Sequence, residues 1–134
     1  MVLESEMDPV WEMMKRLWFT DEFVERENAD FHAVRDVFIK TPIEGCLGGT
    51  SSVADLAYKD QLHLINVPTH IIAAGADPAT PVDHSYAIYE RINGSSLDVI
   101  EGQRHFSHVE VPDQFNSLLR QGLDKMALSK TSDS

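Results

Sequence analysis

Apolar residues in the first half of the chain recur every three or four positions, the spacing of an amphipathic helix. The first stripe consists of Val10, Met13, Met14, Leu17 and Trp18. Asp8 precedes Pro9, and this order predicts a capping carboxylate followed by a proline at the first helical position. Thr20, which is followed by two acidic residues, predicts the start of a second, short helix.

Two further helices are predicted before residue 66. The third carries Phe31, Val34 and Phe38 and ends at Thr41 and Pro42. The fourth is expected from Pro42 through Ala57, although its glycines at positions 45, 48 and 49 weaken it by up to about 1 kcal/mol each. These glycines indicate either a break in the helix or a close packing contact, and the pattern leaves both interpretations open.

The second half of the chain alternates between strand and helix patterns. Residues 69–74 form a short apolar run that ends at Gly75 and predicts a buried strand, and residues 96–100 predict another. Between them a helix is expected from Pro81 to Asn93, with one apolar face made of Val82, Tyr86, Tyr89 and Ile92. The closing helix, from about Pro112, has an apolar side made of Phe115, Leu118, Leu119, Gly122, Leu123 and Met126. This order implies parallel strands joined by a right-handed crossover.

Two parallel strands do not make a self-sufficient sheet. Parallel sheets need partners along their edges, because an unpaired edge presents free N–H and C=O groups. We therefore expect a partner to cover the open edge, most economically through a homodimer that joins the two sheets about a two-fold axis.

Composition places the chain among ordinary globular proteins. It has 134 residues, of which 43% are hydrophobic and 25% charged, which suits one domain with a helical region at 1–66, a βαβα part at 67–128 and a flexible tail at 129–134. Its 22 acidic and 11 basic residues give a net charge of −11, which excludes nucleic acid and membrane surfaces as favoured partners. No secretion signal or membrane-spanning run is visible, so we expect a cytoplasmic protein.

The candidate chemistry lies directly after the two predicted strands. Asp77 follows the first strand and His105 follows the second, so both project from the same edge of a parallel sheet. There a carboxylate can orient an imidazole while the other ring nitrogen takes a proton. The alternative is that Asp77 only caps the turn before the helix at Pro81, as Asp-Pro sequences often do.

These segments resemble a known family. Residues 75–81 and 105–112 are similar to the acid and histidine segments of α/β-hydrolases, most closely the 3-oxoadipate enol-lactonase group. Residues 16–20 and 41–45 resemble the helical lid of that group, and residues 55–56 and 65–69 resemble its return from the lid to the sheet. The resemblance implies a truncated α/β-hydrolase-like fold, a helical lid followed by the last two strands of a sheet that a partner completes. It implies that Asp77 is the triad acid and His105 the triad base.

The nucleophile of this family is missing. A nucleophile elbow requires Gly-x-Ser-x-Gly between a strand and a helix, and this pentapeptide does not occur in the sequence. The nearest string, from Gly49 to Val53, lacks the final glycine and a preceding strand, and is interpreted as a loop or helix cap. The chain therefore carries an acid and a base without a nucleophile.

Other residues are weaker candidates. His108 ranks second to His105, and Arg104 is placed to bind a substrate carboxylate. Trp11, Met14 and Trp18 line either an apolar pocket or simply the core. The remaining histidines lack metal-ligand spacing, and Cys46 is interpreted as a packed thiol, so neither a metal nor a cofactor is expected.

Three functions remain open. The chain is the carboxyl-terminal half of an enol-lactonase-like hydrolase, which contributes the Asp/His pair for hydrolysis of a lactone or ester once an amino-terminal half supplies the serine. Alternatively, it is a stand-alone enzyme whose His–Asp dyad isomerises, cyclises or decarboxylates a small oxo-acid by general acid–base chemistry. The third possibility is a non-catalytic remnant or interaction module.

Overall fold

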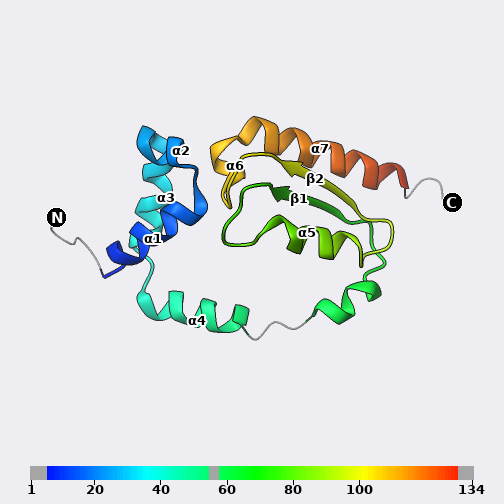
Figure 1. The fold of residues 1–134 in the computed structure, drawn as a ribbon, viewed down its shortest axis with the longest axis horizontal. Helices are drawn as coiled ribbons and strands as arrows, with labels where there is room; N and C mark the ends of the chain where they lie inside the picture. The colour runs from blue at the N-terminus through cyan, green and yellow to red at the C-terminus, as the bar shows by residue number, and fades with distance from the viewer. Residues whose placement is uncertain (1–5, 55–57, 130–134) are drawn as a thin grey trace. The chain divides into compact units, whose positions relative to one another are not determined.

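The computed structural model describes residues 6–54 and 58–129 and divides the chain into two compact units, Met1–Ala57 and Tyr58–Ser134. The first unit is helical, and the second contains a two-stranded parallel sheet with helices (Figure 1). This confirms the predicted α/β class, a helical region followed by a βαβα-type unit. None of the helices within the described ranges is both long and apolar enough to cross a membrane.

The described residues of the first unit form four helices, α1 (Asp8–Trp18), α2 (Asp21–Arg26), α3 (Ala29–Ile39) and α4 (Ile43–Ala54). The predicted cap at the start of α2 is confirmed, because the Thr20 side chain accepts a hydrogen bond from the Phe23 N–H. Asn28 caps α3 in the same way by accepting from the Phe31 N–H at 2.9 Å. Polar side chains thus set where two of the helices begin.

Aromatic rings form the core of this unit. Trp11 is 2% exposed, and its ring centroid lies 5.4 Å from that of Phe31 and 5.5 Å from that of Phe38. Phe19 is fully buried and stacks on Phe23 at 4.9 Å. Such offset and edge-to-face contacts add roughly 0.5–1.5 kcal/mol per pair to the burial of the ring surface.

The predicted cap at Asp8 is wrong. Helix α1 has Met7 at its N-cap and Asp8 in its first turn, one residue further into the helix than expected. The Asp8 carboxylate is nearly buried and accepts a hydrogen bond from Arg35 of α3, with Nη2 and Oδ1 3.1 Å apart. Its partner is therefore a cation 27 residues away, which a local capping rule does not take into account.

The glycine-rich segment is a continuous helix. Helix α4 runs through all three glycines, and a Cβ atom added at Gly45, Gly48 or Gly49 would meet nothing within 4 Å. Neither a helix break nor close packing therefore explains them. Residues 55–57, at the end of the predicted helix, lie outside the described residues.

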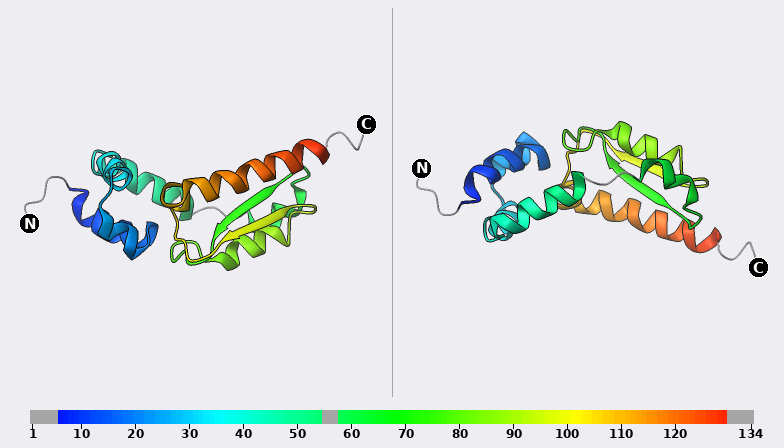
Figure 2. Two further views of the ribbon diagram at one scale, coloured as in Figure 1. Left: turned by 90° about the horizontal axis from the view of Figure 1, so that it is seen from above. Right: turned by 90° about the horizontal axis from the view of Figure 1, so that it is seen from below.

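The second unit starts with a 3-10 helix, η1 (Lys59–Leu64), which the sequence pattern did not predict. It continues with β1 (His70–Ala74), α5 (Val82–Tyr89), β2 (Ser96–Ile100), the short α6 (Ser107–Glu110) and α7 (Pro112–Ser129). The two strands pair in parallel from His70 opposite Ser96 to Ala74 opposite Ile100. Helices α5 and α7 cover opposite faces of this sheet (Figures 1 and 2).

The faces of β1 can be assigned from its contacts. His70 faces α7, because a Cβ atom on Gly122 of that helix would lie 2.2 Å from the His70 ring. Side chains alternate along a strand, so Ile72 and Ala74 also face α7 while Ala73 faces α5. Gly122 is therefore required for the close approach of α7 to the sheet.

Two predictions about burial in this unit are wrong. β1 is only half-buried apart from Ala73, since helices cover its faces but the described residues place no strand beside its outer edge. On α5, the predicted apolar residues Tyr86 and Tyr89 are 46% and 43% exposed. The tyrosines match the helical spacing, but the less exposed residues of α5 are Val82, Ser85, Ala87 and Ile88, of which only Val82 belongs to the predicted face.

Candidate active site

Two loops at the carboxyl edge of the sheet hold the predicted pair. The loop after β1 and the loop after β2 are joined by hydrogen bonds from the Gly75 N–H to the Ile100 carbonyl and from the Ala76 N–H to the Gln103 carbonyl, both at 2.9 Å. Gly102 turns the second loop with a positive φ of 73°, which favours glycine. These backbone contacts bring the residue pair after the strands together.

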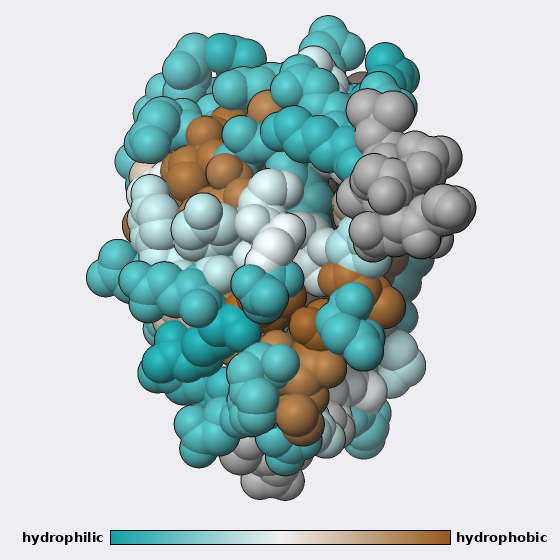
Figure 3. Space-filling model, turned by 90° about the vertical axis from the view of Figure 1, so that its right-hand side faces the viewer, coloured by the Kyte–Doolittle hydropathy of each residue, from teal (hydrophilic) through white to brown (hydrophobic). Residues whose placement is uncertain are grey.

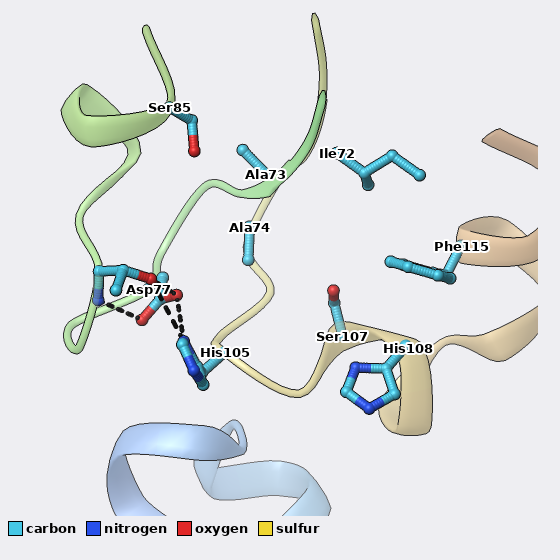
Figure 4. Close-up of a pocket in the computed structure, with 10 residues that line it drawn as sticks. Ile72, Ala73, Ala74, Asp77, Ser85, His105, Ser107, His108 and Phe115 are labelled. Atoms are coloured by element: carbon cyan, nitrogen blue, oxygen red, sulfur yellow. Dashed lines mark hydrogen bonds and ion pairs between the residues drawn. The ribbon is translucent and has the colours of Figure 1, made fainter. Parts of the chain in front are cut away.

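Asp77 and His105 are in direct contact. The His105 Nδ1 lies 2.7 Å from the Asp77 Oδ2, although the residues are 28 positions apart in the sequence (Figure 4). The Asp77 side chain is 7% exposed and that of His105 is 34% exposed. A shielded carboxylate therefore holds one nitrogen of an imidazole whose ring remains open to solvent, the arrangement that general-base chemistry requires.

Asp77 makes different contacts with its two carboxylate oxygens. Oδ1 accepts the backbone N–H groups of Ala79 at 2.8 Å and Thr80 at 3.0 Å, which closes the turn before α5. Oδ2 accepts the Thr80 hydroxyl at 2.7 Å and contacts His105. The turn thus fixes the carboxylate in the orientation that meets the imidazole.

This network also controls the charge of Asp77. Burial raises the pKa of the carboxyl, but hydrogen bonds from the Thr80 hydroxyl and N–H, from His105 and from the Ala79 N–H outweigh it and lower the pKa below its ordinary value. Asp77 is therefore ionised at neutral pH. An ionised Asp77 favours an N–H at Nδ1 of His105, which leaves Nε2 as the proton acceptor of the neutral ring.

A pocket of about 170 Å³ adjoins the pair. Its lining comes from both strand-end loops, from β1 and from helices on both sides of the sheet (Figure 4). The lining residues are Ile72, Ala73, Ala74, Asp77, Thr80, Ser85, His105, Ser107, His108 and Phe115. The polar groups near His105 and the apolar side chains of Ile72 and Phe115 suit a small ligand that has one polar and one apolar side.

His108 lines the same pocket as His105. Its ring packs against those of Phe106 and Phe115, with centroid distances of 5.1 and 5.8 Å. Burial lowers its pKa, and the charge of His105 lowers it further, so His108 is neutral at neutral pH. His108 thus brings a second, uncharged imidazole to the pocket.

The other predicted residues lie elsewhere. Arg104 is half-buried next to His105 and does not line the pocket. Trp11 belongs to the aromatic core of the first unit, Trp18 packs its ring against Trp11 and Phe38, and Met14 is half-buried on the same helix. Their role as pocket residues stays a prediction.

The structure gives no elbow geometry to the serine-containing string that begins at Gly49. This string lies within α4, without a strand before it. Within the described ranges, no group of three or more His, Cys, Asp or Glu side chains is placed to hold a metal ion.

Sequence reasoning missed three hydroxyl groups of the pocket. Thr80 donates to Asp77, while Ser85 and Ser107 line the pocket (Figure 4). The sequence did contain a signal for Thr80, because a hydroxyl residue three positions after an aspartate is typical of a hydrogen-bonded turn. Ser85 and Ser107 had none, since only the packing of helix on sheet brings them to the pocket.

Comparison with known proteins supports a hydrolase relationship. No protein-family model matches the chain. It is 29% identical over 116 residues to 3-oxoadipate enol-lactonase 2 of Acinetobacter baylyi, a match that covers 87% of this chain and 43% of that protein. It is also 35% identical over 66 residues to a putative carbamate hydrolase RutD of Cronobacter turicensis, covering 49% of this chain and 25% of that protein. The chain thus spans less than half the length of these relatives.

Solved structures agree. A hydrolase from Pseudomonas aeruginosa matches 90% of this chain with a TM-score of 0.83 and 27% identity, and the match covers 45% of that hydrolase. An enol-lactonase from Burkholderia xenovorans has the same fold over 90% of this chain, with a TM-score of 0.84 at 23% identity. In sequence and in fold, the chain is therefore similar to enol-lactonase-like α/β-hydrolases over the part it shares with them.

Proposed function

We propose that this α/β-hydrolase-like chain contributes the acid and the base, Asp77 and His105, to the hydrolysis of a lactone or ester. The observation that carries the proposal is the 2.7 Å contact between His105 Nδ1 and Asp77 Oδ2 at the carboxyl ends of two parallel strands. The similarity to enol-lactonases supports a small lactone as the substrate class. The chain would act as the carboxyl-terminal half of the enzyme.

In this mechanism His105 accepts a proton at Nε2 from an attacking serine hydroxyl and later returns it to the leaving oxygen. Asp77 keeps the imidazole oriented and stabilises its positive charge, and Thr80 keeps Asp77 ionised and in place. The serine and its oxyanion hole must come from outside this sequence, which lacks a nucleophile elbow. No cofactor takes part in these steps.

A chimera tests the proposal. The part of the Acinetobacter baylyi enol-lactonase that precedes its matched segment is joined to this chain, and hydrolysis of 3-oxoadipate enol-lactone and of 4-nitrophenyl acetate is measured. His105→Ala and Asp77→Asn should each lower kcat about 10³–10⁴-fold, because the base is lost or wrongly oriented. The control is His84→Ala, an exposed histidine that does not line this pocket. Equal rates for the His105 variant and the control would contradict the assignment.

One observation favours a second candidate function. The His–Asp pair is formed within this chain, and His105 stays accessible without any nucleophile. Such a dyad can move protons on an enolisable oxo-acid by itself. This alternative predicts that the chain alone exchanges deuterium into an enolisable ketone at a rate that Asp77→Asn reduces. Folded protein without exchange and without hydrolysis in the chimera would support a non-catalytic interaction module.

A further inference from the structure

The hydroxyl group of Thr80 contacts the base of the acid–base pair as well as the acid. Its oxygen lies 2.7 Å from the Asp77 Oδ2 and 3.3 Å from the His105 Nδ1. The distance between that Oδ2 and that Nδ1 is 2.7 Å, so the three atoms form a closed triangle (Figure 4). Thr80 therefore contacts the imidazole directly and not only through the carboxylate.

The protons of this triangle follow from the groups present. A hydroxyl group has a single hydrogen, which the Thr80 side chain donates to the ionised Asp77. The lone pairs of the hydroxyl oxygen are then left to accept, and the Nδ1–H of His105 is within their reach. This N–H group consequently makes a three-centre hydrogen bond, with its shorter limb to Asp77 and its longer limb to Thr80.

A second acceptor limits how the imidazole can move. With one contact at Nδ1, the ring would be free to turn about the line that joins Nδ1 to Asp77, and Nε2 would sweep through many directions. The Thr80 oxygen restrains this rotation because it lies off that line. The Phe106 ring adds a stacked contact, with a centroid distance of 6.0 Å and an interplanar angle of 26°. The direction of Nε2 is thus set within this chain alone.

We infer that Thr80 is a positioning residue for the base, which holds His105 at Nδ1 through its own hydroxyl oxygen and aims Nε2 at the nucleophile. The inference rests on the proposed function and adds a third side chain to the acid–base pair. Thr80 acts on the alignment of the base and not on the affinity for substrate. Its loss should therefore lower kcat and leave KM unchanged.

The first test uses the full 134-residue chain, ¹⁵N-labelled, at neutral pH. Thr80→Val keeps the shape of the side chain, and its new methyl group keeps water out of the place of the lost hydroxyl. We expect the Nδ1 proton of His105 to exchange with water about three- to tenfold faster, as the loss of one hydrogen bond predicts. Thr80→Ser, which restores a hydroxyl group, should return the rate to that of the unmodified chain.

The Ala79 N–H group reports whether the carboxylate has moved. It donates to the Asp77 Oδ1 at 2.8 Å, so its exchange accelerates if that oxygen leaves its position. Asp77 stays ionised at neutral pH in Thr80→Val, because even its ordinary pKa is only 3.8. Faster exchange at His105 with an unchanged rate at Ala79 would therefore support a direct contact. Faster exchange at Ala79, or no change at His105, would overturn the inference.

Thr69→Val is the matched control. The Thr69 hydroxyl donates to the Val67 carbonyl at 3.0 Å, next to the residue at which β1 begins. Figure 3 shows this end of the molecule, where apolar areas lie between hydrophilic ones, and Val67 is 62% exposed. Because His105 lies beyond the opposite ends of the strands, Thr69→Val should change neither exchange rate.

The chimera with the enol-lactonase segment separates this inference from the proposed function. In the chimera, Thr80→Val should lower kcat about three- to tenfold at an unchanged KM, and Thr80→Ser should restore it. Faster Nδ1 exchange in the chain, without hydrolysis by the unmodified chimera, would support the positioning role and count against the proposed function. Hydrolysis at the full rate by the Thr80→Val chimera would overturn the positioning role and leave the proposed function standing.

Discussion

The two units of this protein differ in how far each completes its own structure. The helical unit buries Trp11, Phe19, Phe23 and Phe31 to 3% exposure or less, and its helices satisfy their backbone groups internally. The sheet unit buries fewer large side chains, and the described residues place no strand beside the outer edge of β1. An apolar pattern is therefore sufficient to close a helical core, whereas a sheet also needs a neighbouring strand for its backbone groups.

The largest expected loss of stability comes from a substitution in the aromatic core of the helical unit. Trp11→Ala should lower the free energy of unfolding of the helical unit by about 3–5 kcal/mol, because the large ring leaves a cavity among Phe31 and Phe38. Urea unfolding followed by fluorescence reports on this unit, since the remaining tryptophan, Trp18, also lies in it. Val37→Ala, at a position that is 71% exposed, should change the free energy by less than about 0.5 kcal/mol. A similar small loss for both variants would show that the aromatic core does not stabilise the unit.

The second prediction concerns the close contact between Gly122 of α7 and His70 of β1. Gly122→Ala should destabilise the sheet unit by about 1–3 kcal/mol, because the new methyl group would overlap the buried His70 ring. Gly49→Ala is the matched control, where a Cβ atom meets nothing within 4 Å. It should stabilise α4 by about 0.5–1 kcal/mol through helix propensity alone. Thermal unfolding of both variants measures the difference in stability. A stabilising effect of Gly122→Ala would contradict the prediction.

A smaller loss of stability is expected from removing the N-terminal cap of α2. Thr20→Ala should cost the helical unit about 1 kcal/mol, since the Phe23 N–H loses its acceptor. Thr20→Asn keeps an oxygen in capping position and should retain most of the stability, as Asn28 does for α3. The urea unfolding midpoints of the two variants measure this difference in stability. An equal loss of stability in both variants would mean that the capping hydrogen bond contributes nothing.

The smallest effect is on the charge of Asp77. Folding lowers its pKa from the ordinary 3.8, so the carboxylate contributes stability above that pH, and this contribution is lost as pH falls through the lowered pKa. Thr80→Val removes the hydroxyl donor and should raise the pKa of Asp77 toward its ordinary value. A carboxyl ¹³C titration by NMR measures the change. Thr69→Val, whose hydroxyl bonds only the Val67 carbonyl among the described contacts, should leave the titration unaltered, and an equal shift in both variants would refute the role of Thr80.

The residues that sequence reasoning placed well are those with local causes. The spacing of Phe31 and Phe38 and the cap at Thr20 depend on neighbours within a few positions. Both strands were predicted to within one residue. The contact between Asp77 and His105 could be predicted from the sequence because parallel strands end at the same edge of a sheet. The wrong predictions at Asp8, Tyr86 and Tyr89 share another cause. Tertiary packing gave Asp8 a partner on another helix, and tertiary packing also set which face of α5 is buried.

Periodicity and strand order predicted the class of each unit, the order of its longer helices and its strands, and the pair of residues at the sheet edge, because these features depend on local chemistry and chain connectivity. The three-dimensional structure was needed to show that Thr80 donates a hydrogen bond to Asp77, that Gly122 makes room for His70, and that residues of β1, α5 and α7 line one pocket. These features arise where α5 and α7 meet β1, and contacts between elements distant in sequence leave no periodic signal in the chain.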